Sequence, residues 1–229
     1  MLKFQQKEKM MKKYLEVLKN CPLFKNISED NLLTMLSCLG AKTEIFDKKY
    51  TIMAEGTPAK YIGIVLSGSV QIIQVDYYGN RSILSSLEPS QVFAEAFAAA
   101  EIKSIPVSIV ANEPSEIMFI DCAHIMHTCS NNCGFHNQLI FNLMQDIAAK
   151  TILFHQKIEI ISKRSTREKL LTYLSFYSKK TGSASFDIPY DRQELADYLE
   201  VDRSGLSAEI SKLRSEGLLN SYKKHFELL

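Results

Sequence analysis

The stretch RQELADYLEVDRSGLSAEISKLRSEGLL, residues 192–219, decides the fold of the carboxyl-terminal part of the chain. It is typical of two short helices joined by the turn Glu200-Val201-Asp202, with Asp191 and Asp202 as helix caps. Apolar residues recur at helical spacing, as Leu195, Ala196 and Leu199 in the first helix and Leu206, Ile210 and Leu213 in the second. Because the small Ala196 lets the helices approach closely, we expect a helix-turn-helix.

The outer face of the second predicted helix carries small hydrogen-bonding groups between cations, a pattern that suits the major groove of DNA. The predicted DNA contacts are Arg192, Arg203, Ser204, Ser207, Ala208, Ser211, Lys212 and Arg214. The basic segment 222–226 follows, and we expect it to form a wing hairpin. Since Glu209 and Glu216 lie on the same helix, an ordinary helix pair with a solvated charged face is the alternative.

Composition sets limits on this interpretation. The net charge is +1, so any attraction for DNA has to come from a local patch. The chain has 229 residues with 46% hydrophobic and 23% charged residues, which predicts two globular domains. We find no apolar run long enough to cross a bilayer and no signal peptide, so we expect a cytoplasmic protein without a membrane partner. Its five cysteines should then be reduced.

Upstream, the periodicity changes twice. Helical spacing up to Gly40 is followed by short alternating runs from Ala41 to Asp121, with turn signals at Glu55-Gly56, Ser67-Gly68 and Tyr78-Gly79-Asn80. Closely spaced strands with tight glycine turns indicate an all-β sandwich or roll.

From about Asn137 a long helix is predicted. Its apolar residues follow a heptad pattern through Ile140, Met144, Ile147, Thr151, Phe154, Ile158 and Ile161. Two copies could therefore pair along this seam as a homodimer, with the polar Thr151 fixing register or contacting a ligand. The alternative is that the helix packs only on its own β domain. A break at Lys163-Arg164-Ser165 indicates a hinge, which gives the expected division: a sensor domain 1–136, a dimerisation helix 137–163 and a DNA-binding domain 164–229.

The stretch 122–136 gathers three cysteines and three histidines. Cys129, Cys133 and His136 are spaced four and three apart, so on one helical face they could bind zinc or act as a redox switch. Structural packing is the alternative, since cysteine is often a small buried hydrophobe.

With these motifs, the chain resembles the Crp/Fnr superfamily of regulators over nearly its whole length. The matching segments are Cys21-Pro22-Leu23-Phe24 through Leu39, Glu55-Gly56, Ser67-Gly68-Ser69-Val70, Arg192 to Ala196, and Asp202-Arg203-Ser204. The resemblance implies an α+β fold: an N-terminal double-stranded β-helix or jelly roll like a cyclic-nucleotide-binding domain, a long dimerisation helix and a C-terminal winged helix-turn-helix. It also implies that a ligand reorients the DNA-binding domains about a hinge, here near residues 162–165.

Departures from the family pattern bear on the effector. The Gly-Glu-Leu and Arg-Ser motifs of cyclic AMP binders become Ala94-Glu95-Ala96 and Ile105-Pro106, so the cation that would pair with a buried phosphate is missing. The resemblance thus argues against cyclic AMP and leaves the effector unknown, with haem, a metal or another small molecule open. The predicted effector pocket comprises Glu95, Ile105, Pro106, Thr151 and Phe154. The recognition helix keeps only the first Arg of the family pattern, so the usual operator is not assumed.

The sequence therefore predicts a dimeric, sequence-specific DNA-binding transcription regulator controlled by a small-molecule, redox or metal/haem signal, with RNA polymerase as a further partner. A regulatory module that acts through a protein partner is the alternative. We find no Gly-x-Ser-x-Gly elbow, phosphate-binding glycine loop or zinc-protease motif, so we do not expect an enzyme.

Overall fold

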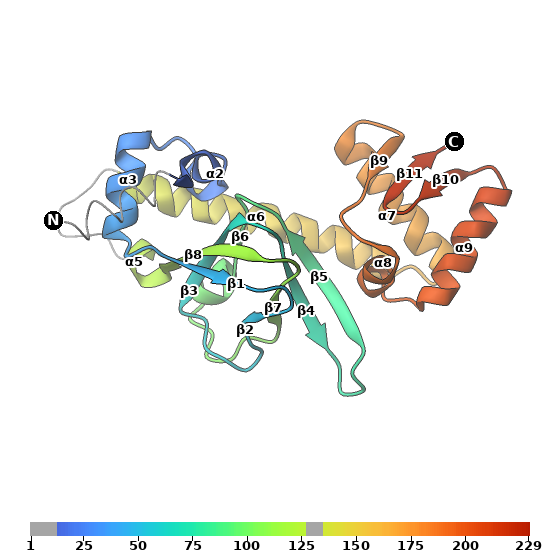
Figure 1. The fold of residues 1–229 in the computed structure, drawn as a ribbon, viewed down its shortest axis with the longest axis horizontal. Helices are drawn as coiled ribbons and strands as arrows, with labels where there is room; N and C mark the ends of the chain where they lie inside the picture. Colours follow the sequence, from blue (N-terminus) through green and yellow to red (C-terminus); the bar gives the residue numbers. More distant parts are fainter. Residues whose placement is uncertain (1–12, 127–134) are drawn as a thin grey trace. The chain divides into compact units, whose positions relative to one another are not determined.

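The computed structural model describes residues 13–126 and 135–229, and the chain divides into two compact units (Figure 1). The first comprises Met1–Gln74 and Ser86–Lys150, and the second comprises Val75–Ser85 and Thr151–Leu229. The helices are α2 (Leu15–Lys19), η1 (Pro22–Phe24), α3 (Glu29–Cys38), α4 (Glu95–Ala99), α5 (Cys122–Met126), α6 (Phe135–Ile161), α7 (Thr166–Thr181), α8 (Arg192–Leu199) and α9 (Arg203–Ser215). The strands are β1 (Lys42–Phe46), β2 (Thr51–Met53), β3 (Tyr61–Ser67), β4 (Val70–Val75), β5 (Arg81–Leu87), β6 (Val92–Phe93), β7 (Ser108–Ala111), β8 (Ser115–Asp121), β9 (Ser185–Asp187), β10 (Leu219–Tyr222) and β11 (His225–Leu228).

The first unit contains most of the predicted β roll, whereas residues 75–85, at the β4–β5 hairpin, are grouped with the second unit. One four-stranded sheet has the order β1-β8-β3-β6 and the other has the order β2-β7-β4-β5. Strand β3 is buried over Ile62–Leu66 because it lies in the interior of its sheet. Gly63 on β3 is required for packing, since a Cβ there would lie 2.0 Å from Cζ of Phe93. The expected all-β unit is confirmed, with one addition: the short helix α4 follows β6.

The turns of the roll fall where the glycine signals predicted them. Gly56, Gly68 and Gly79 have φ angles of 84°, 76° and 85°, a region that residues with a Cβ rarely adopt. At the tip of the β4–β5 hairpin, the Asp76 carboxylate accepts hydrogen bonds from the N–H groups of Tyr78 and Asn80 at 2.9 and 2.8 Å. These local bonds fix the hairpin turn.

The long helix α6 begins at Phe135, two residues before the predicted start, and ends at Ile161, where the predicted hinge follows. Leu139 and Leu143 on α6 are buried in the core of the first unit, together with residues of α3 and β3. One face of α6 therefore packs on its own domain, while Met144 on another face is 65% exposed. In the part of the chain that the structure describes, no helix is both long and apolar enough to span a membrane.

The second unit ends in a winged helix-turn-helix. Ser165 and Glu168 form a capping box at the start of α7, and Gly182 ends the helix with a φ angle of 66°. The antiparallel sheet β10-β11-β9 completes the domain, with Phe226 opposite Phe186 in the register of β11 and β9. Buried side chains from the helices form the core: Leu170, Leu174, Leu195, Leu199, Leu206, Ile210 and Leu213.

Candidate functional site

Helices α8 and α9 form the predicted helix-turn-helix, and both predicted caps are present. The N–H of Glu194 donates to the Asp191 carboxylate at 2.9 Å, and the N–H of Asp191 donates back to the Glu194 carboxylate at 2.7 Å. At the start of α9, the N–H of Gly205 donates to Oδ2 of Asp202 at 2.8 Å. The Ser204 hydroxyl also donates to Asp202, and this bond is the main cause that lowers the carboxyl pKa of Asp202. The start of α9 is therefore fixed by its own sequence.

The outer face of α9 is exposed to solvent. The predicted contact residues on this helix are all exposed: Arg203, Ser204, Ser207, Ala208, Ser211, Lys212 and Arg214. The Ser211 hydroxyl donates a hydrogen bond to the carbonyl oxygen of Ser207 at 3.0 Å, and the Ser204 hydroxyl donates one to the Asp202 carboxylate. Each hydroxyl oxygen can still accept a hydrogen bond from a base or a water molecule. The face thus offers three cations and small acceptor groups to a partner.

Arg192 lies apart from this face. Its guanidinium donates to the Ser221 hydroxyl at 3.4 Å and lies 5.2 Å from the centre of the Phe226 ring. Arg192 is half-buried, and burial lowers the pKa of its guanidinium. Arg192 is the first residue of α8, and its side chain packs against the strands of the wing.

The wing has the predicted basic tip. Strands β10 and β11 pair from Leu219 opposite Leu228 to Tyr222 opposite His225, so Lys223 and Lys224 form the turn. Tyr222 and both lysines are exposed, and Nζ of Lys224 donates to the carbonyl of Pro189 at 2.7 Å. The tip thus carries two cations beside an exposed aromatic ring.

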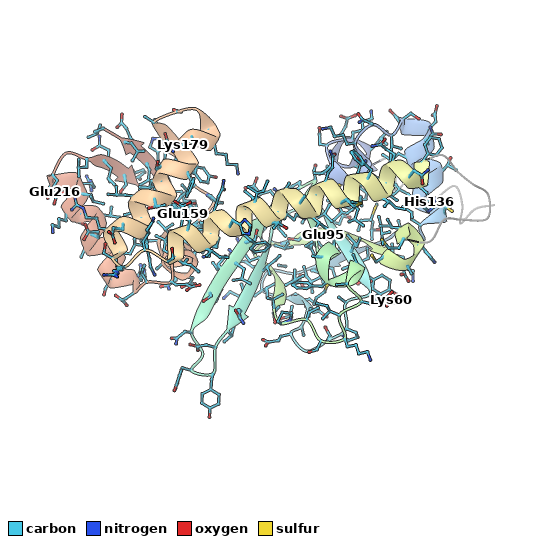
Figure 2. All side chains as sticks on the ribbon, turned by 180° about the vertical axis from the view of Figure 1, so that it is seen from behind. Lys60, Glu95, His136, Glu159, Lys179 and Glu216 are labelled. Carbon is cyan, nitrogen blue, oxygen red and sulfur yellow. The ribbon has the colours of Figure 1, made fainter. Side chains whose placement is uncertain are left out.

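In the β roll, Glu95 is a buried member of an ion cluster that the sequence did not reveal. It lies in the first turn of α4, beside α6 (Figure 2). Nζ of Lys150, on α6, lies 2.9 Å from Oε1 of Glu95, 2.7 Å from Oδ2 of Asp146 and 2.7 Å from the carbonyl oxygen of Val92. The ammonium thus donates hydrogen bonds to Val92 and Glu95 and forms an ion pair with Asp146. Two carboxylates around one ammonium leave an excess negative charge, and Oε2 of Glu95 accepts no hydrogen bond from the described residues.

Ile105 and Pro106 stand where the family resemblance would place a phosphate-binding Arg. Ile105 is buried in the apolar core of the first unit, and its backbone bonds to Thr57 and Gly56, while Pro106 is exposed. A cyclic nucleotide needs a cation for its phosphate. Ile105 supplies none, and Lys150 is already held by two carboxylates. These residues do not fit a cyclic nucleotide.

Thr151 and Phe154, the other predicted pocket residues, lie on α6 in the second unit and are exposed. The structure brings Glu95 together with Lys150 and Asp146, which the sequence had not singled out. No short-range pattern could have found this cluster, because Glu95 and Lys150 are 55 positions apart.

The predicted metal or redox set is only partly described, since Cys129 and Cys133 lie outside the described residues. His136 is buried, and its Nε2 lies 3.0 Å from the carbonyl oxygen of His124. Among the described cysteines, Cys21 is buried, which raises the pKa of its thiol to about 12. Such a thiol is a poor nucleophile at neutral pH. The described residues hold no cluster of three His, Cys, Asp or Glu side chains that could bind a metal.

A β roll, a long helix and a winged helix-turn-helix with an exposed basic face define a class: transcription regulators that join a sensor domain to a DNA-binding domain. Two family models match the chain, "Cyclic nucleotide-binding domain" at residues 43–132 and "Crp-like helix-turn-helix domain" at residues 168–229. The chain therefore belongs to the Crp/Fnr family of DNA-binding transcription regulators.

Curated relatives agree with this assignment. The "Global nitrogen regulator" of Synechococcus elongatus is 21% identical over 223 residues, which cover 86% of this chain and 92% of the relative. The "Transcriptional activator protein FnrL" of Cereibacter sphaeroides is 19% identical over 184 residues, which cover 74% of this chain and 68% of the relative. These relatives are regulators and not enzymes.

Solved structures share the fold. FixK2 from Bradyrhizobium japonicum matches with a TM-score of 0.64 and 19% identity, over 82% of this chain and 92% of that structure. The c-di-GMP responsive regulator CLP of Xanthomonas campestris matches with a TM-score of 0.70 and 16% identity, over 85% and 97%. The predicted α+β architecture is confirmed.

Proposed function

We propose that the chain is a homodimeric, sequence-specific transcription regulator that acts in the cytoplasm and reads DNA with the outer face of α9. The observation that carries this proposal is the exposed row of serines and cations on a helix whose opposite side is buried and whose start is capped. An α-helix with such a face fits the major groove, where short side chains allow close approach.

The contacts have distinct roles in this proposal. Arg203, at the start of α9, reaches a guanine edge or a phosphate. Lys212 and Arg214 neutralise phosphates, and the lysines at the wing tip add charge beside the groove. Arg192, packed under the wing, supports the hairpin and approaches the DNA backbone from there. The full proposed set is Arg192, Arg203, Ser204, Ser207, Ala208, Ser211, Lys212 and Arg214.

Substitutions on α9 test the assigned face. Using duplexes that the wild-type protein selects from a randomised pool, we expect Ser207→Glu and Arg203→Ala to abolish specific binding while circular dichroism remains unchanged. Lys103→Ala, which removes an exposed cation in the β roll, is the matched control and should bind normally. Wild-type affinity should fall steeply with salt because phosphate contacts release counterions. Unchanged binding by both α9 variants would refute the assigned face.

We propose that α6 pairs with its copy to form the dimer. On the predicted seam, Met144, Phe154 and Ile158 are 65%, 46% and 58% exposed in the single chain. Large apolar side chains in a row along one helix favour burial against a partner, and heptad spacing suits a second α6. We propose the corresponding division of the chain into a sensor domain at residues 1–136, a dimerisation helix at 137–163 and a DNA-binding domain at 164–229.

We propose that the β roll receives the signal, with Glu95, Ile105, Pro106, Thr151 and Phe154 around the effector. Among the described residues, the cation beside Glu95 is Lys150, which two carboxylates already hold, and this supports an effector without a phosphate group. Signalling through haem, or through a metal or redox change at Cys129, Cys133 and His136, remains part of the proposal. RNA polymerase is the proposed partner for transcription control.

A further inference from the structure

Helix α9 carries two carboxylates that oppose its proposed task. Glu209 lies within α9 and Glu216 is its C-cap residue, whereas Arg203, Lys212 and Arg214 are its cations. Counting 100° per residue, Glu209 and Glu216 share one flank of the helix, and Arg203 and Arg214 share the opposite flank. Carboxylates beside a groove repel phosphates, so this acidic flank weakens DNA binding unless it is compensated.

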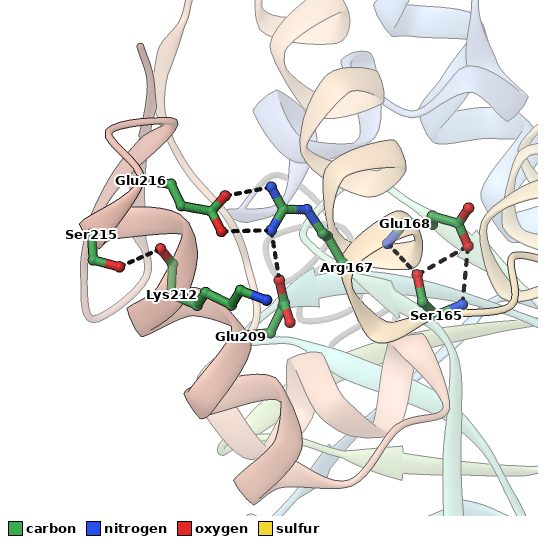
Figure 3. A network of polar contacts seen from close by, with 7 residues as sticks. All are labelled: Ser165, Arg167, Glu168, Glu209, Lys212, Ser215 and Glu216. Carbon is green, nitrogen blue, oxygen red and sulfur yellow. Dashed lines mark hydrogen bonds and ion pairs between the residues drawn. The ribbon is translucent and has the colours of Figure 1, made fainter.

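The positive charge of Arg167 offsets the negative charges of both carboxylates, which it contacts directly (Figure 3). Its Nη1 lies 3.3 Å from Oε1 of Glu209 and 3.1 Å from Oε1 of Glu216, and its Nη2 lies 2.5 Å from Oε2 of Glu216. The bonds to Glu216 form a bidentate pair, a geometry that the planar guanidinium provides and an ammonium does not. Glu216 raises the pKa of Arg167, and Arg167 in turn lowers the pKa of Glu216.

The Arg167 side chain extends from the first turn of α7, which is held by its own N-terminal cap. It is the second residue of α7, whose start is held by the capping box of Ser165 and Glu168 (Figure 3). Within that box the N–H of Ser165 donates to Glu168 at 3.1 Å, and the N–H of Glu168 donates to the Ser165 hydroxyl at 3.2 Å. The first turn of α7 is thus rigid, and Arg167 ties it directly to α9.

The partial exposure of the Arg167 ion pairs indicates that Arg167 contributes more to DNA binding than to folding stability. About a third of the Arg167 and Glu216 side chains is exposed, and ion pairs in such positions add little to folding stability. Their charges still act on a polyanion that approaches the same helix. We propose that Arg167 is a positioning residue for DNA binding: it neutralises the acidic flank of α9 and holds α9 at a fixed angle to α7. This inference rests on the proposed use of α9 as the reading helix.

Fluorescence anisotropy with two labelled duplexes tests the inference, one selected by the wild-type protein and one of random sequence. We expect Arg167→Met to weaken binding to both duplexes about tenfold at low salt, with a smaller loss at high salt because the repulsion is screened. The triple variant Arg167→Met, Glu209→Gln, Glu216→Gln removes the carboxylates as well and should regain most of the affinity. Arg167→Lys should recover only part, since it cannot form the bidentate pair.

The outcomes separate this inference from the proposed function. A wild-type protein that binds neither duplex overturns both. If the wild type binds and Arg167→Met binds equally well, the inference alone is wrong. An equal loss in the Arg167→Met and triple variants would show a purely structural role and would also refute it. Should Arg167→Met fail to fold, the pair Glu209→Gln, Glu216→Gln serves instead: it frees the Arg167 charge and must tighten binding to both duplexes.

Discussion

At the scale of single residues, two lysines with little exposure to solvent show how the local environment determines the effect of a charge. Lys150 and Lys157 are both on α6, but they meet different surroundings. Lys150 is enclosed by two carboxylates and a carbonyl, whereas Lys157 meets the carbonyl oxygens of Ile83 and Tyr198 and lies 3.7 Å from the centre of the Tyr198 ring. Two carboxylates lie within 3 Å of the Lys150 ammonium, whereas the Lys157 ammonium contacts carbonyl oxygens and an aromatic ring, with the charges of Glu200 and Lys169 acting on it as well. Their responses to substitution and to pH should therefore differ.

Replacing Lys150 by Met should destabilise the β roll by about 3 kcal/mol or more, because the change leaves the buried carboxylates of Glu95 and Asp146 without a counter-ion. The midpoint of urea unfolding measures this loss. In the matched control, Lys150→Met is combined with Glu95→Gln and Asp146→Asn, and much of the stability should return. An unchanged midpoint in Lys150→Met alone would mean that the cluster is not closed as described.

The stability of the second unit should depend on pH through Lys157. Burial lowers its pKa from 10.5 to about 8. Between these values the unfolded chain holds a proton that the folded chain lacks, so the free energy of unfolding rises with pH in this window. The rise should not exceed about 3 kcal/mol, because one pKa unit corresponds to about 1.4 kcal/mol and the Glu200 carboxylate offsets part of the burial penalty.

Urea unfolding at pH 7.5 and pH 10 measures the rise, with the pH values chosen to bracket most of the interval between the two pKa values. Other groups of the chain also titrate at alkaline pH, so the quantity of interest is the difference in this rise between the wild type and Lys157→Met. The variant should lose the pH-dependent increment. An identical pH dependence in both proteins would contradict the assigned environment.

At the scale of elements, local signals predicted the fold well and long-range pairings escaped them. The caps Asp191 and Asp202, and the turn glycines such as Gly79, act within a few residues of themselves, so the sequence pattern was sufficient. Helix α4 was missed because it spans only five residues inside a β pattern. The Arg167–Glu216 pair joins residues 49 positions apart and depends on the folded domain.

The apolar seam of helix α6 is the element on which the proposed dimer depends. Ile158→Glu places a charge in the proposed α6 seam of both subunits, so we expect the dimer dissociation constant to rise by about two orders of magnitude or more. Sedimentation equilibrium measures it. Leu153→Glu is the matched control, since Leu153 is 56% exposed on α6 but lies outside the seam positions, and it should stay dimeric. A wild-type protein that remains monomeric at high concentration would refute the seam.

At the scale of the whole molecule, we assign signal sensing to the first unit and DNA binding to the second. The first carries Ile105 and Pro106 where the family resemblance would place a phosphate-binding Arg, which is why we propose an effector without a phosphate group. The second carries the capped helix α9, which we propose reads DNA, and a basic wing. The sequence predicted the fold of the roll and of the winged helix-turn-helix, and the reading face stays a prediction. The contact of Glu95 with Lys150 could not be predicted, because only the folded roll brings these residues together.

A hydroxyl-radical footprint of the wild-type protein on a selected operator tests the central claim most directly. Two copies of α9 in successive major grooves predict two protected half-sites about 34 Å apart, one helical turn, related by two-fold symmetry. Ser207→Glu should remove both protections together. A single protected patch, or protection that survives Ser207→Glu, would contradict the account.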